Sequence, residues 1–423
     1  MTKRMLCLLL LAVFGGSIHA QDISGNWQGT LKAGIDLRVI LEISKVPNGA
    51  LSARLYSIDQ GPDAIPVSSI ALQGSDLKLT VEAVRGSYIG KLSPDGQTIT
   101  GTWTQMLPLP LVLHRATKET EWQRDSSPHK VSFVTVDHNV KLEVLDWGGS
   151  GRALVLLAGL GNTAHVFDKF ALKLTPTYHV YGITRRGFGE SSAPDTGYSA
   201  DRLGDDVLAV IDSLKLDRPV LVGHSIAGEE LSSIGTRHPE KVAGLIYLDA
   251  GYPYAFYDKT RGDLNIDSLD LEKKLQQLGP GMAPKEQKQI VQELLQTGLP
   301  QLEKDLQERS KDLETAPSDQ PTVELPAPAR AILAGEQKYT DIHVPALAIF
   351  AVPHSGGPAS QDPQVRAAAE ARDLANTTAQ AKAFETGIPS AHVVRLAHAN
   401  HYVFLSNEAD VLREMNNFLA GLH

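Results

Sequence analysis

The amino-acid sequence predicts an α/β fold, a mostly parallel sheet with helices on both faces, preceded by a small all-β domain. From residue 131 onward, short apolar runs alternate with longer segments of helical periodicity. Strands that are apolar throughout and separated by helices are typical of a parallel sheet covered on both faces. Residues 21–116 differ, because apolar and polar positions alternate there in short runs between turn sequences. That alternation indicates antiparallel strands.

Residues 1–20 are typical of an export signal. Lys3 and Arg4 precede an apolar run at 5–14, and small residues lead to Ala20. A positive start, a short apolar segment and a small residue at the cleavage point characterise a signal peptide. The run is too short for a stable membrane span, which needs about 20 apolar residues. We therefore expect cleavage after Ala20 and a periplasmic or secreted protein.

Composition and charge exclude several classes of function. The single cysteine, Cys7, lies inside the predicted signal. The exported chain would therefore have no thiol for a disulfide, a nucleophile or a metal site. The formal net charge is −9 at pH 7, without a basic cluster. Such a chain is a poor candidate for binding nucleic acid or anionic membranes, so we expect a small molecule as its partner.

The all-β region is predicted to form a small antiparallel barrel or sandwich. Its expected strands are residues 26–31, 37–43, 51–58, 67–72, 77–83, 87–92, 98–104 and 109–114. Its partner is unknown. Its aromatic residues could bind a polymer or a lipid, or the domain could only pack on its neighbour; the residues concerned are Trp27, Tyr56, Tyr88 and Trp103. The polar, unpatterned stretch at 117–130 predicts a linker.

The α/β domain is predicted to occupy residues 131–423. Its expected strands are residues 154–157, 180–183, 220–222, 244–248, 346–351 and 393–396. Its expected helices include residues 200–214, 228–237 and 408–419. An insertion at about 252–341 interrupts the alternation and holds amphipathic patterns at 269–278 and 287–306. We interpret this insertion as a helical cap between two strands of the sheet.

The strongest functional feature is the segment 220–228, Val-Leu-Val-Gly-His-Ser-Ile-Ala-Gly. An apolar strand runs into a tight turn at Ser225, and the turn opens a helix. Such a turn presents the serine hydroxyl outward, and the helix N-terminus directs amide groups at developing negative charge. The strict pattern is Gly-x-Ser-x-Gly, and Ala227 stands at its last position here. The structural alternative is an ordinary glycine-rich turn.

Residues 131–423 resemble the α/β-hydrolase superfamily, in its cap-bearing branch of esterases, epoxide hydrolases and haloalkane dehalogenases. Besides the turn at Ser225, three segments match the family in the expected order. They resemble its oxyanion loop, its Arg-Gly-x-Gly-x-Ser loop and its histidine loop, and they are residues 156–162, 184–192 and 397–404.

The resemblance implies the roles of several residues. Ser225 would be the nucleophile and His401 the general base. The backbone amides of Leu160 and Ile226 would hold the oxyanion. Epoxide hydrolases and dehalogenases of this family attack with aspartate, so serine disfavours both activities. Acyl transfer to water through an acyl-enzyme is the chemistry that a serine nucleophile favours.

The acid of the triad is where the sequence departs from the family pattern. Family members usually carry it after the penultimate strand, but no carboxylate follows residues 346–351 until Asp362. Asp249 follows the preceding strand, where some members place the acid. We expect Asp249 to orient His401, with Asp362, another carboxylate or a missing acid as alternatives. His398 lies close to His401 in sequence but belongs to no metal-ligand motif, so no metal site is expected.

The predicted function is hydrolysis of a small or medium, largely apolar carboxylic ester, without a cofactor. Tyr252, Tyr254 and Phe256 begin the predicted cap and are candidates for substrate binding, although the same cluster could be core. An amidase or aminopeptidase is the first alternative, with Glu229, Glu230 or an acid of the cap as the charge that recognises an amine. A non-catalytic small-molecule binding protein on the same scaffold is the second.

Overall fold

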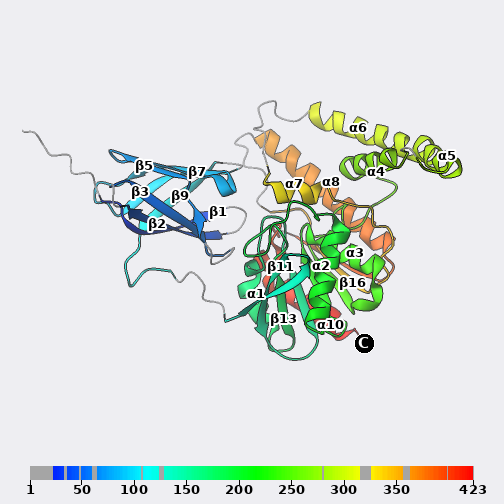
Figure 1. The fold of residues 1–423 in the computed structure, drawn as a ribbon, viewed down its shortest axis with the longest axis horizontal. Coiled ribbons are helices and arrows are strands. Elements are labelled where there is room, and N and C mark those ends of the chain that lie inside the picture. Colours follow the sequence, from blue (N-terminus) through cyan, green and yellow to red (C-terminus); the bar gives the residue numbers. More distant parts are fainter. Residues whose placement is uncertain are drawn as a thin grey trace, which may run out of the picture. The chain divides into compact units, whose positions relative to one another are not determined.

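The computed structural model describes residues 22–32, 36–46, 49–59, 64–105, 108–122, 128–278, 281–314, 325–355, 363–397 and 399–422. The predicted signal peptide at 1–20, Asp362 and His398 lie outside the described residues. The chain divides into two compact units. Most of an N-terminal sheet forms one unit, and the residues from Trp122 onward belong to the other (Figure 1).

The N-terminal sheet has nine strands among the described residues, in the order β4-β3-β2-β1-β9-β8-β7-β6-β5. Their bounds are β1 Gly25–Lys32, β2 Asp36–Lys45, β3 Leu51–Ser57, β4 Ile65–Pro66, β5 Ser69–Gln73, β6 Asp76–Val81, β7 Gly86–Leu92, β8 Thr98–Thr104 and β9 Pro108–Arg115, with a 3-10 turn η1 at Glu82–Val84. Strands β4 and β5 are the two edges, although only Val67 and Ser68 separate them. The amide of Val67 donates to Ala53 in β3 (3.3 Å), and that of Ser68 donates to Thr80 in β6 (2.8 Å). The sheet therefore closes on itself, and the strand predicted at 67–72 is observed as β5 at Ser69–Gln73.

The aromatic residues of this sheet form its core. The exposed fractions are 0% for Trp27, 3% for Tyr56, 1% for Tyr88 and 5% for Trp103. The hydroxyl of Tyr88 lies 3.1 and 3.0 Å from the carbonyl oxygens of Ile99 and Leu111. These four rings are therefore core residues and present no exposed stacking surface.

The second sheet confirms the predicted α/β fold class. Its order is β10-β11-β13-β12-β14-β15-β16-β17. The bounds are β10 Lys130–Asp137, β11 Val140–Gly148, β12 Ala153–Leu157, β13 His179–Ile183, β14 Val220–His224, β15 Gly244–Leu248, β16 Ala346–Ala351 and β17 Ala391–Leu396. Strand β11 pairs antiparallel with β10 and β13, and the strands from β13 to β17 are parallel. The carboxyl ends of β14, β15 and β17 therefore meet at one edge, just before Ser225, Asp249 and the loop to His401.

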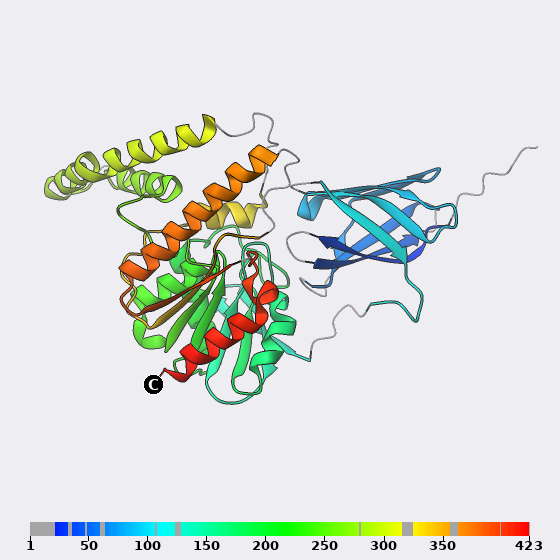
Figure 2. The same cartoon turned by 180° about the vertical axis from the view of Figure 1, so that it is seen from behind.

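Helices cover both faces of this sheet because alternate residues of each strand point to opposite faces. Leu245 and Tyr247 of β15 pack in one hydrophobic cluster, and Ile246 and Leu248 pack in the other. The first cluster includes residues of α2 (Ala200–Ser213), α3 (Ala227–Arg237) and α8 (Pro363–Gly387). The second includes residues of η2 (Ala164–Phe167), α1 (Asp168–Leu174), α9 (Val403–Ser406) and α10 (Glu408–Ala420). Figure 2 shows α8 in orange and α10 in red.

The segment between β15 and β16 is helical. It contains α4 (Leu264–Gln277), α5 (Pro284–Glu293), a π-helical turn η4 (Leu294–Gly298), α6 (Leu299–Glu314) and α7 (Ala327–Leu333). The helix predicted at 287–306 is therefore interrupted by η4. Lys304 of α6 donates a hydrogen bond to the carbonyl of Thr260 (2.7 Å), which ties α6 to the chain that follows β15. Ile332 of α7 packs with Ile226 directly after Ser225. Among the described residues, no helix is long and apolar enough to span a membrane.

Candidate active site

Ser225 occupies a strained turn between a strand and a helix. Strand β14 ends at His224 and α3 begins at Ala227. Ser225 has a φ of 54°, in the left-handed region that non-glycine residues rarely adopt. A Cβ on Gly228 would lie 2.1 Å from the carbonyl oxygen of Ala250. The start of α3 can therefore pack this closely against the backbone of Ala250 only with glycine at position 228. The glycine that the turn requires for packing thus stands one residue later than in the strict pattern.

Asp249, the predicted acid, contacts His401. Asp249 follows β15 with a φ of 46° and is 1% exposed. Its Oδ2 lies 2.7 Å from Nδ1 of His401, and its Oδ1 accepts a hydrogen bond from the amide of Ala351 (3.0 Å). Burial alone would raise the pKa of this carboxyl, but hydrogen bonds from His354 and His401 hold the pKa at about 2. Asp249 is therefore an anion fixed against one nitrogen of His401.

His224 fixes the loop that carries His401. Its Nε2 donates a hydrogen bond to the carbonyl oxygen of His401 (3.0 Å), and the two ring centroids are 4.7 Å apart. Burial, followed by the neighbouring His401, lowers the pKa of His224 to about 3, so the ring is neutral. Since His224 directly precedes Ser225, this contact holds the loop of His401 next to the serine turn.

Tyr254 lies next to Ser225 and influences it electrostatically. Among the described residues, no hydrogen bond joins Ser225 to His401. Catalytic hydrogen bonds are often long or unformed without substrate. The contact of His224 with the carbonyl oxygen of His401 is what holds the histidine loop beside the serine turn.

The predicted oxyanion donors lie beside the serine. An ideal Cβ built on Gly159 would be 3.1 Å from Cβ of Ser225 and 2.8 Å from Nδ1 of His224, so the loop of Leu160 passes directly over the turn. Ile226 is the N-cap of α3. Neither the amide of Leu160 nor that of Ile226 donates a hydrogen bond to another described residue. Both remain available to a ligand oxygen.

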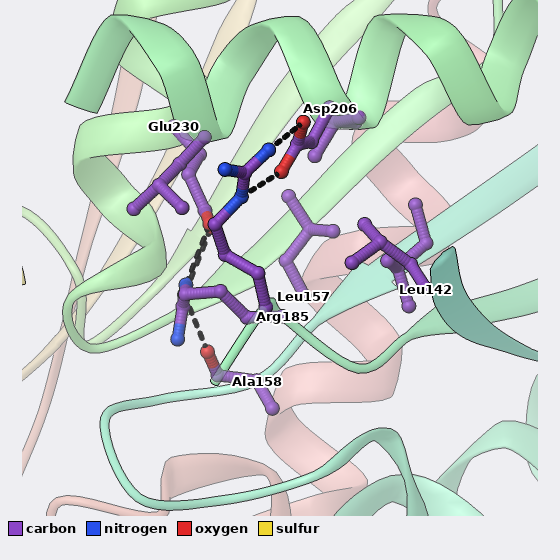
Figure 3. A pocket seen from close by; sticks show the side chains of 10 residues that line it. Leu142, Leu157, Ala158, Arg185, Asp206 and Glu230 are labelled. Carbon is purple, nitrogen blue, oxygen red and sulfur yellow. Dashed lines mark hydrogen bonds and ion pairs between the residues drawn. The ribbon is translucent and has the colours of Figure 1, made fainter. Parts of the chain in front are cut away.

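Buried ion pairs support the oxyanion loop. Arg185 donates to both carboxylate oxygens of Glu230 (2.6 and 2.9 Å) and to the carbonyl of Ala158 (2.9 Å). Figure 3 shows Arg185 linked to Glu230 and Ala158, with Asp206 nearby. Asp206 accepts two hydrogen bonds from Arg186 (2.6 and 2.7 Å). Both arginines are thus held in buried ion pairs.

A histidine held between two carboxylates anchors the other end of the same loop. His165 lies in η2, and its two ring nitrogens face Glu143 (3.4 Å) and Asp168 (3.3 Å). Burial would lower the pKa of His165, but these two carboxylates raise it to about 9. The nearby His129 lies 3.1 Å from Asp168.

The three aromatic residues predicted to bind substrate have different environments. Tyr254 reaches Ser225 and packs with the apolar cluster around Ile226. The hydroxyl of Tyr252 lies 3.3 Å from Oδ2 of Asp249, so this residue borders the predicted acid. Phe256 packs in the hydrophobic core of the sheet, with its ring 5.6 Å from that of Phe384. The structure thus brings Tyr252 and Tyr254 to the site and places Phe256 in the core.

Two residues that sequence reasoning missed join this site. His354 follows β16, where most family members would carry the acid, and its Nε2 lies 2.7 Å from Oδ2 of Asp249. Its Nδ1 lies 2.8 Å from Oδ1 of Asp373 in α8. The histidine in place of the usual acid was the available signal for His354. No local pattern marks Asp373.

Within the part of the chain that the structure describes, two clusters have donor atoms within 4.8 Å of one another, as a metal site would require. They are Asp249 with His354 and His401, and His129 with His165 and Asp168. In both clusters, the histidine nitrogens face carboxylate oxygens at 2.7–3.3 Å. Hydrogen bonds and ion pairs account for these contacts.

Comparison with known proteins relates the chain to hydrolases. A model of the Alpha/beta hydrolase family matches residues 154–414, more than half of the chain. The 2-(acetamidomethylene)succinate hydrolase of Mesorhizobium japonicum is 28% identical over 101 residues, which are 24% of this chain and 36% of that protein. The non-heme chloroperoxidase of Streptomyces lividans is 32% identical over 142 residues, 33% of this chain and 50% of that protein.

These matches are partial. The matched region covers between 36% and 59% of the length of three curated relatives: the hydrolase named above, a putative non-heme haloperoxidase of Mycobacterium phage D29 and a hydrolase-superfamily protein of Bacillus subtilis. Among solved structures, an esterase from Exiguobacterium antarcticum is similar with a TM-score of 0.45 and 18% identity, over 69% of this chain and 100% of that one.

Proposed function

The chain belongs to the alpha/beta hydrolase family, and we propose that it is an exported serine hydrolase that cleaves carboxylic esters. Ser225 attacks the ester carbonyl to form an acyl-enzyme, and water then releases the acid. The observation that carries the proposal is the 2.7 Å contact between Asp249 and His401 beside the strained turn of Ser225.

The geometry supports a defined role for each group. Asp249 accepts the Nδ1 proton of His401, so Nε2 is the nitrogen that takes the proton of Ser225. The positive charge that develops on His401 faces the buried carboxylate. The amides of Leu160 and Ile226 stabilise the oxyanion of the tetrahedral intermediate, which is often the largest single contribution to such catalysis. His401 then donates its proton to the leaving alcohol. In the second half of the reaction, His401 takes a proton from water, and the water attacks the acyl-enzyme and releases the acid.

An apolar substrate is supported by the residues around the oxyanion donors. Ile226 packs in a cluster with Tyr198, Leu203 and Ile332. Partly buried apolar side chains border this cluster, and they include Leu160, Phe188, Tyr254 and Leu333. Apolar side chains beside the proposed oxyanion donors favour a small or medium acyl or alcohol group without charge.

The amidase or aminopeptidase alternative has less support. Recognition of a free amine needs an available carboxylate. Glu230 is 2% exposed and is already paired with Arg185, and Glu229 is 0% exposed. Burial and the neighbouring Glu230 raise the pKa of Glu229 well above its usual value, which favours its neutral form. Neither residue offers a charge to an amine. A non-catalytic binding protein would not need the Asp249–His401 contact beside Ser225, so this contact favours a catalytic protein over the binding-protein alternative.

Hydrolysis of p-nitrophenyl acetate, butyrate and octanoate tests the proposed activity. The protein without residues 1–20 should hydrolyse at least one of them, and Ser225→Ala should abolish turnover while retaining the thermal unfolding midpoint. An active Ser225→Ala variant would contradict the serine mechanism. Amino-acid anilides, assayed alongside, separate esterase from aminopeptidase activity.

Export is tested separately by cell fractionation. The proposal expects the mature chain outside the cytoplasm, with Gln21 as its N-terminal residue by mass spectrometry. An uncleaved chain confined to the cytoplasm would reject export and leave the hydrolase proposal standing.

A further inference from the structure

We propose that His354 and Asp373 are positioning residues of this site, which orient Asp249 and set the net charge that His401 faces. The inference rests on the proposed function and deepens it. Its basis is a continuous line of four side chains on four segments that are distant in sequence.

The contacts in this line are short. Oδ1 of Asp373 lies 2.8 Å from Nδ1 of His354, and Nε2 of His354 lies 2.7 Å from Oδ2 of Asp249. The same oxygen, Oδ2, lies 2.7 Å from Nδ1 of His401. Oδ2 of Asp373 also accepts a hydrogen bond from the backbone amide of His354 (2.8 Å), and this bond fixes the loop after β16 to α8. Asp249 is thus held from one side by His354 and from the other by His401.

Both ring nitrogens of His354 face carboxylates, so the geometry favours a proton on each. Burial alone would lower the pKa of His354, but Asp249 and Asp373 raise it to about 9. His354 is then a cation between two anions at neutral pH. Together with Asp249 and Asp373 it carries one net negative charge.

The net charge matters because His401 becomes positive during the reaction. A protonated His354 without Asp373 would cancel the charge of Asp249 and leave the imidazolium of His401 without a counter-charge. Asp373 restores one net negative charge to the group formed by Asp249, His354 and Asp373. Opposite charges favour the charged form of a neighbour and like charges disfavour it, by amounts that are largest within a few ångströms.

Among the described residues, the other titratable groups in contact with this cluster are neutral. The hydroxyl of Tyr252 lies 3.2 Å from Nε2 of His354, and burial raises its pKa. The ring of Tyr402 lies 5.7 Å from that of His401, and burial raises its pKa as well. His224, on the other side of His401, has its pKa lowered by burial. The charge facing His401 is therefore set by Asp249, His354 and Asp373.

Two variants change this charge in opposite directions. His354→Gln keeps an N–H donor towards Asp249 but removes the positive charge, so the group becomes more negative. Asp373→Asn keeps the shape of the side chain but removes a negative charge, so the group becomes neutral. The double variant returns to one net negative charge. Glu370→Gln on the exposed face of α8 and His392→Gln, whose side chain is 64% exposed, are the matched controls.

The readout is the acid limb of the profile of kcat/KM against pH, which reports the protonation of the essential base in the free enzyme. The limb should move to higher pH in His354→Gln and to lower pH in Asp373→Asn, each by about half a unit or more. In the double variant it should return close to that of the parent, and in both controls it should not move. A purely structural role would lower the rate without shifting the limb in opposite directions.

Shifts of both single variants in the same direction, or no shift in either, would overturn the proposal. If the parent hydrolyses no ester, the pH dependence of Ser225 labelling by a fluorophosphonate replaces kcat/KM. If Ser225 is not labelled either, the proposed function fails. The ¹⁵N chemical shifts of the His354 and His401 rings then still test the charge relation, because the same opposite displacements of the His401 titration are expected without turnover.

Discussion

Oδ2 of Asp249 lies 2.7 Å from Nδ1 of His401, although 152 positions separate the two residues in the chain. Parallel strands bring them together, because Asp249 follows β15 and His401 follows β17 at the same edge of the sheet. The buried carboxylate fixes which nitrogen of His401 carries the proton.

Asp249→Asn should lower kcat by about 10³–10⁴-fold, because the amide no longer selects the reactive tautomer of His401 or stabilises its positive charge. KM should change little. Ester hydrolysis and thermal unfolding measured on the same preparation check this. Asp362→Asn is the matched control and should retain the parent rate, since Asp362 was the competing candidate for the acid. A large loss in Asp362→Asn with a mild effect in Asp249→Asn would reverse the assignment.

Gly159→Ala should impair the chemical step more than folding. The added methyl group would lie 2.8 Å from Nδ1 of His224 and 3.1 Å from Cβ of Ser225, so the oxyanion loop must move away from the serine. Misplacing one oxyanion donor costs about 10²–10³-fold in kcat. Gly298→Ala, whose nearest neighbour would be 3.5 Å away, is the control and should be close to neutral. Parent-like kcat in Gly159→Ala would show that this loop does not hold the oxyanion.

Arg185→Ala should destabilise the protein by about 3–5 kcal/mol, because it leaves Glu230 buried without its partner. It also removes the donor to the carbonyl of Ala158, so residual activity should fall as well. Urea unfolding measures the first effect. Arg413→Ala breaks an ion pair whose arginine side chain is 56% exposed, and it should leave the urea midpoint nearly unchanged. Equal costs for the two variants would be inconsistent with a buried, structural role for Arg185.

His165→Gln should reduce stability in a pH-dependent way. The pKa of His165 is raised to about 9 in the folded protein, above its usual value of 6.5. A raised pKa contributes stability that is complete below about pH 6.5 and is lost as pH rises through about 9. The difference in free energy of unfolding between parent and variant should therefore be largest near pH 6 and should narrow towards pH 10. His392→Gln, whose side chain is 64% exposed, serves as the control. A difference that stays constant with pH would contradict a charged His165.

Much of the fold follows from periodicity in the sequence. The strands at 244–248 and 346–351 were predicted at their observed bounds, since each is an apolar run buried on both faces. Strand β10 was missed because its apolar residues do not mark a core face: Val131 and Phe133 are each 50% exposed. Helix α8 was missed because its first half is rich in alanine and carries no regular stripe of large apolar residues.

The site was predictable as far as local motifs reach. The turn at Ser225 has its own sequence pattern, and Asp249 was found from its position after a strand. The contacts of His354 with Asp249 and Asp373 join residues 105 and 19 positions apart. Since α8 was not predicted, no argument from the sequence could bring Asp373 to His354.

The central claim is most directly tested by covalent labelling of the native protein with a fluorophosphonate, followed by intact-mass and peptide-mass analysis. The account predicts one adduct per chain, mapped to Ser225, and none in Ser225→Ala. A folded protein that acquires no adduct, or an adduct that maps to another residue, would contradict Ser225 as the nucleophile.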